Sequence, residues 1–348
     1  MHRTRWTWIL IAVLLVSFAC GGSQEQTANS EVTQSVQGQE TSSAELAYDK
    51  ASDAYDATED PEERVAIAKD YLARHPNSEW TDNALARAMY PLVDDLERPA
   101  EAYELFDQYL PGISDPDTRL GAQKVLAILH SRTGNLAELD ALVATTIEEH
   151  EFQFTDYLDL METAVEAEAW ELVSRQADAS RALANPEAFK NQWPDISEED
   201  AESWGHRRQA YVAAYKGWAL ENLGQHEAAL ATFSDNAEKT TFTFLGVDDT
   251  PLHLYWGQSL LRQGQPDDAM TRLEKEALYG STEAMESYQE AWAAVNGSTE
   301  GLDDHLWLLR QQHSKPLPQF ALANYAGETV DTANIEDHVI LVTSWSPT

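Results

Sequence analysis

The sequence predicts a mainly α-helical protein, in which helical hairpins over residues 44–314 are followed by the first strands of an α/β region at 315–348. Two observations carry this prediction. Between residues 44 and 310 apolar residues recur at helical spacing, and Gly and Pro interrupt the pattern after roughly every 12–20 residues. From Lys315 onwards prolines and β-branched residues dominate instead, which favours strands.

The N-terminus has the pattern of an export signal. Arg3 and Arg5 form a short basic start, an uncharged apolar run covers residues 8–16, and Ala19 is a small residue directly before Cys20. The apolar run is shorter than the roughly 20 residues that span a bilayer.

This arrangement resembles a bacterial lipoprotein signal. The resemblance implies that residues 1–19 form a signal peptide and that Cys20 is the lipid-attachment site. It also implies that the chain is anchored to a membrane of the bacterial cell envelope, facing the periplasm or the exterior. Simple secretion and an uncleaved anchor remain alternatives. Cys20 is the only cysteine, so an intramolecular disulfide and a cysteine-based zinc site are excluded.

Residues 20–43 are expected to form a flexible tether. After Cys20 the segment consists mainly of Ser, Gln, Glu, Thr, Asn and Gly, and it contains no aromatic residue. Such a composition cannot bury enough apolar surface to fold. A chain of this length has a root-mean-square reach of about 25–30 Å.

The chain is strongly acidic, with 60 Asp and Glu against 23 Lys and Arg and a net charge of −37. Phosphates would be repelled by this charge, so nucleic acid and anionic lipid surfaces are excluded as partners. The acidic surface is consistent with simple solvation, with a cationic partner or with a saline habitat.

The first helices are predicted from start and stop signals. Asp60 is a candidate cap, Pro61 suits the first helical position, and Glu63 stands where a capping box needs it. The segment from His75 to Ser78 ends this helix. Gly121 and Gly134 are interpreted as helix punctuation. Two further apolar stripes are Ala102, Leu105, Phe106 and Tyr109, closed by Pro111 and Gly112, and Val125, Ile128 and Leu129, closed by Gly134 and Asn135.

Residues 217–233 and 257–273 repeat each other at a spacing of 40. The matched pairs are Gly217 and Gly257, Leu220 and Leu260, Gly224 and Gly264, Ala229 and Ala269, and Phe233 and Leu273. The pattern resembles the tetratricopeptide repeat, whose period is about 34 residues, so roughly six residues are inserted near 240–251. Small residues allow two helices to approach, the second glycine ends the first helix, and the large residue fills the gap.

Earlier copies of the repeat are degenerate. Residues 127–143 keep the spacing but lack the alanine, and residues 100–106 match only a second helix. Two good copies and three weaker ones are expected. The repeats predict a surface that binds a protein partner. The alternative is an irregular helical domain that only packs and positions the C-terminal segment.

Other chemistry is not predicted: no catalytic residue, no cofactor and no metal site are expected. His150 among Glu148, Glu149 and Glu151 is interpreted as a charged helix end. Residues 193–197 are predicted to be a loop. The tryptophans are expected to line the core or a groove, and a carbohydrate or peptide groove is the alternative; they are Trp170, Trp193, Trp204, Trp218, Trp256, Trp292 and Trp307.

The C-terminal segment predicts a strand, a turn around Gly327, a second strand at Val330 and a buried strand over residues 339–342. It resembles the start of the thioredoxin-like domain of TlpA-type and AhpC/TSA-type proteins. The matching residues are Pro318, Phe320, Leu322, Gly327, Val330, Ile335, Val339, Ile340, Leu341, Val342 and Trp345.

The resemblance implies a thiol-disulfide oxidoreductase or a peroxiredoxin of the cell envelope. The active-site cysteines of that family would lie beyond Thr348, so the sequence is expected to be a fragment. The alternative is a repeat lipoprotein that keeps only vestigial strands and binds a protein partner.

Overall fold

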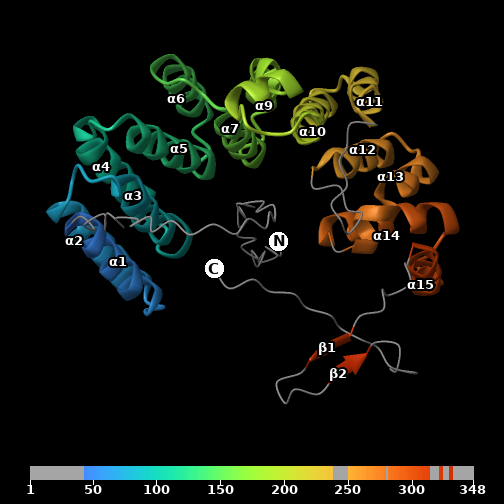
Figure 1. The fold of residues 1–348 in the computed structure, drawn as a ribbon, viewed down its shortest axis with the longest axis horizontal. Coiled ribbons are helices and arrows are strands. Elements are labelled where there is room, and N and C mark those ends of the chain that lie inside the picture. Colours follow the sequence, from blue (N-terminus) through green and yellow to red (C-terminus); the bar gives the residue numbers. More distant parts are fainter. Residues whose placement is uncertain (1–42, 238–249, 280, 314–320, 324–328, 332–348) are drawn as a thin grey trace, which may run out of the picture. The chain divides into compact units, whose positions relative to one another are not determined.

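The computed structural model describes residues 43–237, 250–279, 281–313, 321–323 and 329–331, and this part of the chain is mainly helical (Figure 1), as the sequence predicts. The α-helices are α1 (Ser43–Asp56), α2 (Pro61–Arg74), α3 (Thr81–Tyr90), α4 (Pro99–Tyr109), α5 (Pro116–Arg132), α6 (Leu136–Glu149), α7 (Phe154–Glu166), α8 (Trp170–Ser180), α9 (Pro186–Gln192), α10 (Glu198–Asn222), α11 (His226–Ser234), α12 (Leu252–Arg262), α13 (Pro266–Tyr279), α14 (Thr282–Asn296) and α15 (Leu302–His313). A π-helical turn, Pro91–Asp95, extends α3, and short 3-10 turns follow α4 (Leu110–Gly112) and α8 (Arg181–Leu183).

Successive helices are joined by tight turns whose central residue has a left-handed backbone. Gly134, Gly224 and Gly264 have φ values of 71°, 74° and 72°. At the second of these turns the Gln225 N–H donates to the Leu220 carbonyl over 2.8 Å, which satisfies a carbonyl at the end of the helix. These glycines therefore end their helices, as predicted from the sequence.

Two further turns of this kind contain glutamate instead of glycine. Glu97 and Glu168 both have φ of 54°. Glu168 lies 34 positions after Gly134, and the Ala169 N–H donates to the Ala164 carbonyl over 2.9 Å. At Glu97 the turn is one residue longer, because the π-helical turn adds a residue before it. Four hairpins of the described chain thus share one turn, and a fifth has a version that is one residue longer.

The buried positions after these turns repeat as well. The fifth residue after each turn residue is fully buried; these residues are Ala102, Leu139, Val173, Ala229 and Ala269. The ninth residue is also buried at all five turns; these residues are Phe106, Val143, Ala177, Phe233 and Leu273. Each hairpin therefore presents the same two positions to its neighbouring helices, with different residue sizes.

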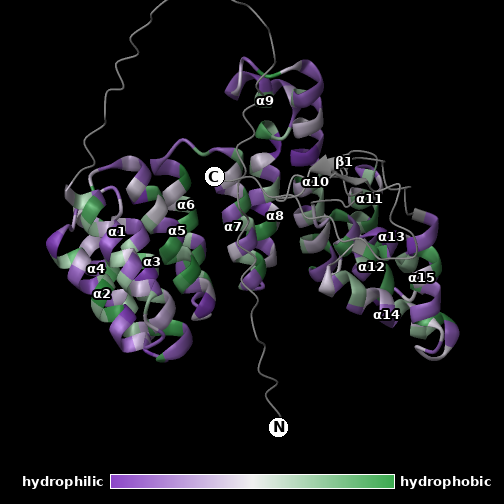
Figure 2. Ribbon diagram, turned by 60° about the horizontal axis from the view of Figure 1, so that its bottom comes forward, coloured by the Kyte–Doolittle hydropathy of each residue, from purple (hydrophilic) through white to green (hydrophobic). Residues whose placement is uncertain are grey.

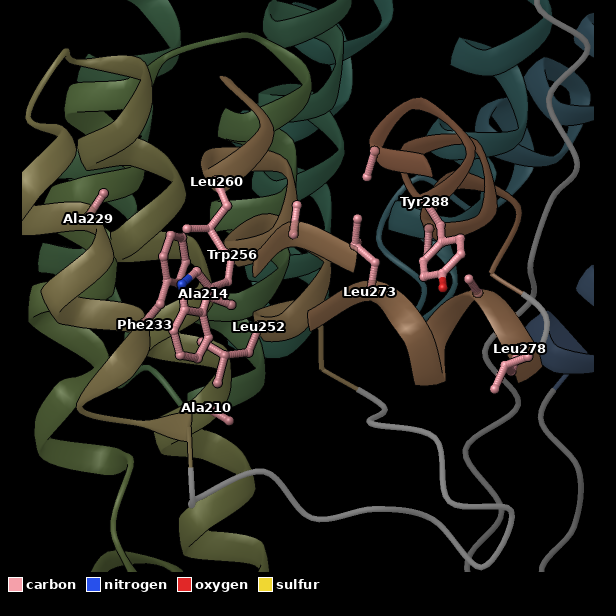
Figure 3. Close-up of a cluster of buried hydrophobic side chains, with 14 of the residues drawn as sticks. Ala210, Ala214, Ala229, Phe233, Leu252, Trp256, Leu260, Leu273, Leu278 and Tyr288 are labelled. Atoms are coloured by element: carbon pink, nitrogen blue, oxygen red, sulfur yellow. The ribbon is translucent and has the colours of Figure 1, made fainter. Parts of the chain in front are cut away.

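The apolar residues form three clusters that follow one another along the chain. The first lies on α1 to α5, the second on α5 to α10 with Tyr255 of α12 packed against it, and the third on α10 to α15. Figure 3 shows the third cluster, in which Phe233 and Trp256 lie together between Ala210 and Leu260. Most helices carry both apolar and polar residues (Figure 2), as expected when one stripe faces the core.

Two local predictions are wrong. Gly121 lies inside α5 and does not end a helix; a Cβ there would be 3.0 Å from the Cγ of Asp82, so glycine permits a close approach of α3 and α5. Glu63 does not form a capping box. The Asp60 side chain accepts from the Glu62 N–H over 3.0 Å, while the carboxylate of Glu63 accepts from the Thr58 hydroxyl over 2.6 Å.

Two short strands, β1 (Ala321–Ala323) and β2 (Thr329–Asp331), pair antiparallel with Leu322 opposite Val330. The sequence predicts a strand, a turn and a strand at these positions. The predicted signal peptide at 1–19, Cys20, the tether up to residue 42 and the rest of 315–348 lie outside the described residues. So does most of the predicted insertion near 240–251.

Candidate partner-binding surface

The first helices of successive hairpins contact one another in sequence order. They are α3, α5, α7, α10, α12 and α14, which we call the first-helix row (Figure 1). The row brings together residues more than thirty positions apart in sequence.

Polar contacts link neighbouring helices of this row. Between α5 and α7, the Lys124 ammonium lies 2.8 Å from an Asp159 oxygen, and the Ser131 hydroxyl donates to the Thr163 carbonyl over 3.0 Å. Between α7 and α10, the Tyr215 hydroxyl donates to Glu162 over 3.1 Å. These contacts tie neighbouring helices of the row to one another.

Two glutamates and two tyrosines lie on four neighbouring helices of the row: Glu162 on α7, Tyr215 on α10, Tyr255 on α12 and Glu283 on α14. The rings of Tyr215 and Tyr255 pack edge to face, with 6.0 Å between their centroids. The charges of Glu162 and Glu283 both act on the Tyr255 hydroxyl. We call these four residues the Glu162 cluster.

The Glu162 carboxyl lies in an environment that disfavours its charged form. Partial burial raises its pKa, and the negative charges of Asp159 and Glu166 raise it further, while the hydrogen bond from Tyr215 acts in the opposite direction. Burial also raises the pKa of Tyr255, with smaller contributions from Glu283 and Glu162. In the described part of the chain, no Lys or Arg pairs with Glu162.

The carboxylates of the cluster are accessible to a partner. Glu162 and Glu283 are both exposed, and Tyr255 is half-buried. Trp218 stacks on Tyr255 with 4.9 Å between ring centroids, which holds the tyrosine in place from α10. The exposed Glu162 side chain, which accepts a hydrogen bond from Tyr215, is the group of this cluster that a cation could approach.

An arginine fixes the junction between two hairpins next to this cluster. The Arg262 guanidinium lies 4.2 Å from the centre of the Trp218 ring and donates to the Asn222 side chain over 2.9 Å. Arg262 stands two residues before the turn residue Gly264, and Asn222 follows Trp218 by four residues.

The junction between α3 and α5 has the same construction. Arg132, two residues before Gly134, lies 4.9 Å from the centre of the Tyr90 ring and pairs with Asp94. Neither junction was predicted from the sequence, because the partners are about forty residues apart. A sequence signal for such a junction has two parts. One is an arginine two residues before the turn glycine of a hairpin, and the other is an aromatic residue four positions before Asp or Asn on the first helix of the preceding hairpin.

The described tryptophans divide into three groups, of which one, Trp80, Trp170 and Trp292, is half-buried against the apolar clusters. Trp218 and Trp256 are buried in the core, as predicted. Trp193, Trp204 and Trp307 are exposed, with 56%, 42% and 60% of their surface accessible. Trp193 lies in the predicted loop between α9 and α10.

Metal ligands do not gather in the described residues: no group of three or more His, Cys, Asp or Glu is placed to hold an ion. His150 follows the end of α6, as predicted, and its Nε2 lies 2.8 Å from the side-chain oxygen of Gln123. None of the described helices combines the length and the apolar character that a bilayer span needs.

Comparison with known proteins adds no relative to this picture. No protein-family model matches the chain, and no curated protein sequence shows significant similarity to it.

Proposed function

We propose that residues 43–313 form a tetratricopeptide-like scaffold whose first-helix row binds a basic segment of a protein partner at the Glu162 cluster. The observation that carries the proposal is the Glu162 carboxylate, which is exposed, surrounded by negative charge and without a Lys or Arg partner among the described residues.

A cation would relieve the electrostatic conflict at this site. Carboxylates and aromatic faces are the groups that hold Lys and Arg side chains in proteins. An incoming ammonium would favour the charged form of Glu162, which its own surroundings disfavour. The site therefore gains more from a basic residue than an ordinary surface glutamate does.

The test is binding of a short lysine-rich peptide to the full chain and to its Glu162→Gln variant, measured by calorimetry. Removing one charge-assisted hydrogen bond is expected to weaken binding by about tenfold or more. The matched control is Glu148→Gln, which removes one exposed carboxylate from α6, outside the row.

The control decides between a site and general attraction to an acidic surface. If Glu148→Gln weakens binding as much as Glu162→Gln does, the peptide is held by net charge alone and the proposed site is wrong. Screening by salt should reduce both effects, but the difference between the variants should remain.

A second proposal rests on the sequence at the two ends of the chain. We propose that Cys20 carries a lipid in the cell envelope and that residues 315–348 begin a thioredoxin-like domain with thiol-disulfide chemistry. The strand pair β1–β2, with Leu322 opposite Val330, supports the second part. Lipid labelling of the wild type and of Cys20→Ser tests the anchor. Sequencing the gene beyond the codon of Thr348, to look for a Cys-x-x-Cys motif, tests the redox domain.

A further inference from the structure

A cavity of about 350 Å³ lies between α11, α12 and α13. Cavities of about 300 Å³ and more that combine apolar lining with a few polar groups are typical of small-molecule sites. This cavity has lining of both kinds. Its apolar lining includes Leu230, Trp256 and Leu260, and its polar lining includes Asp268, Thr271 and Arg272.

Arg272 brings a positive charge to this cavity without an ion-pair partner. Its guanidinium lies 3.7 Å from the centre of the Trp256 ring, and Trp256 stacks against Phe233 with 6.3 Å between ring centroids (Figure 3). In the described part of the chain the Arg272 guanidinium forms no ion pair and no hydrogen bond with Asp or Glu. A guanidinium carries five N–H donors in a planar fork that fits a carboxylate. Those donors therefore remain available to a ligand.

Asp268 brings an unpaired carboxylate to the same cavity. It precedes Arg272 by four residues, so the two side chains lie on the same side of α13. The guanidinium stacks on Trp256 instead of pairing with Asp268, whose exposed carboxylate has no Lys or Arg partner among the described residues. The Thr271 hydroxyl donates to the Asp267 carbonyl over 3.2 Å and keeps its oxygen lone pairs as acceptors. The cavity thus offers a ligand one cationic group and one anionic group.

The repeat itself does not require an arginine at this position. Arg272 is the eighth residue after the turn residue Gly264. The equivalent residues of the other four hairpins with this kind of turn are uncharged; they are Leu105, Leu142, Gln176 and Thr232. Packing of one hairpin on the next therefore does not explain Arg272, whereas a ligand of this hairpin alone would.

We propose that this cavity binds a small zwitterion of the amino-acid type with an apolar side chain. Arg272 holds the carboxylate and Asp268 the ammonium, while Leu230 and Leu260 contact the apolar side chain. A simple anion or cation fits less well, because one of the two charged residues repels it. The volume lies near the lower limit for ligand sites, which suits a single amino acid better than a peptide.

The inference goes beyond partner binding at the Glu162 cluster. It adds a second site, for a small molecule, that uses α11 and α13, and neither helix belongs to the first-helix row. The two sites share no residue. Binding at one can therefore be measured without the other.

The test is calorimetric titration of the full chain with leucine and with two analogues that each lack one charge. N-acetylleucine has no ammonium, and leucinamide has no carboxylate. Leucine should bind, and each analogue should bind more weakly by about tenfold or more, because one charge-assisted hydrogen bond is lost. Glu162→Gln should have the wild-type affinity for leucine, which separates this site from the proposed partner-binding site.

Two variants assign the charges to their side chains. In Asp268→Asn the preference for leucine over N-acetylleucine should disappear, and in Arg272→Gln the preference for leucine over leucinamide should disappear. Asp268 is exposed, so Asp268→Asn tests the site even if Arg272→Gln loosens the contact with Trp256. The matched control Arg310→Gln, which removes an arginine of α15, should retain both preferences.

The absence of binding by leucine, methionine and phenylalanine at millimolar concentration would overturn the proposal. So would equal affinities for leucine and both analogues, because the ligand would then be recognised by its apolar shape without its charges. Preferences that survive in both Asp268→Asn and Arg272→Gln would place the binding elsewhere in the chain, which would also contradict this site.

Discussion

The ring of Phe233 occupies the space that a side chain at position 217 would need. A Cβ at Gly217 would lie 2.6 Å from the Phe233 Cζ atom, well inside van der Waals contact. Gly257 and Leu273 repeat this relationship one hairpin later, where a Cβ would lie 2.7 Å from a Leu273 methyl carbon. In both hairpins a glycine on the first helix thus packs against a large side chain on the second helix.

Gly217→Ala should destabilise the protein by about 1–3 kcal/mol, because the added methyl group overpacks the contact with Phe233. The measurement is the free energy of unfolding from a urea titration. In a Phe233→Ala background the same substitution should cost much less. In the hairpin that turns at Glu168, the position equivalent to Gly217 is Met161 and the position equivalent to Phe233 is Ala177. The fold therefore also accepts a large residue on the first helix opposite a small one on the second. Equal costs in both backgrounds would show that the contact is not the cause.

Glu168→Gly should stabilise the protein by up to about 1 kcal/mol. The left-handed backbone at Glu168 costs an L-residue about 1–2 kcal/mol, and glycine removes that cost. The greater chain entropy of glycine in the unfolded state offsets part of this stabilisation. The converse change Gly134→Ala, at the preceding turn of this kind, should be destabilising. Thermal unfolding of the two variants measures both effects. A loss of stability in Glu168→Gly would mean that the glutamate side chain makes a contribution larger than the backbone strain.

Arg262→Gln should destabilise the junction between α10 and α12 by about 1–2 kcal/mol, because it removes a cation from the Trp218 ring and a hydrogen bond to Asn222. Arg310→Gln on α15 is the control, as it removes an exposed arginine of equal charge. Urea unfolding compares the two variants. If both lose the same stability, net charge accounts for the effect and the stacking does not.

His253 should make stability depend on pH in the acid range. Burial, together with Arg272 and Lys275, lowers the pKa of His253 to about 4. The ordinary value is about 6.5, so the unfolded chain binds the proton first and stability falls as pH drops from about 6.5 towards 4, by up to about 3 kcal/mol.

His253→Gln should remove that part of the loss, while His206→Gln on α10 should not. The check is a series of urea titrations between pH 4 and pH 7, which brackets the two pKa values. Identical profiles for wild type and His253→Gln would contradict the assignment.

Binding of a lysine-rich peptide should strengthen as pH rises through the raised pKa of Glu162, because only the carboxylate attracts the cation. The same raised pKa has the opposite effect on folding: the contribution of Glu162 to stability is lost as pH rises, since the folded state holds the proton more tightly. Calorimetric titrations over a pH series measure the binding. Glu162→Gln should flatten this step, and an unchanged profile would exclude Glu162 as the responsible group.

Much of the fold could be predicted from local patterns. Gly224 and Gly264 mark two turns because a left-handed backbone favours glycine, and the apolar spacing places Leu139 and Phe233 in the core. The turns at Glu97 and Glu168 were not predicted, since glutamate carries no local signal for that conformation. The prediction for Gly121 was wrong for a related reason: its role is a contact with Asp82, about forty residues away in the chain.

By itself, the sequence determined the mainly helical class, the hairpin turns at glycine and the positions of the core residues, because backbone preference and apolar periodicity act over a few residues. Only the tertiary structure decided that Glu162 meets Tyr215, that Arg262 stacks on Trp218 and that α15 exposes Trp307. These contacts join helices tens of residues apart. They depend on how each hairpin packs on the next, which backbone preference and apolar periodicity do not specify.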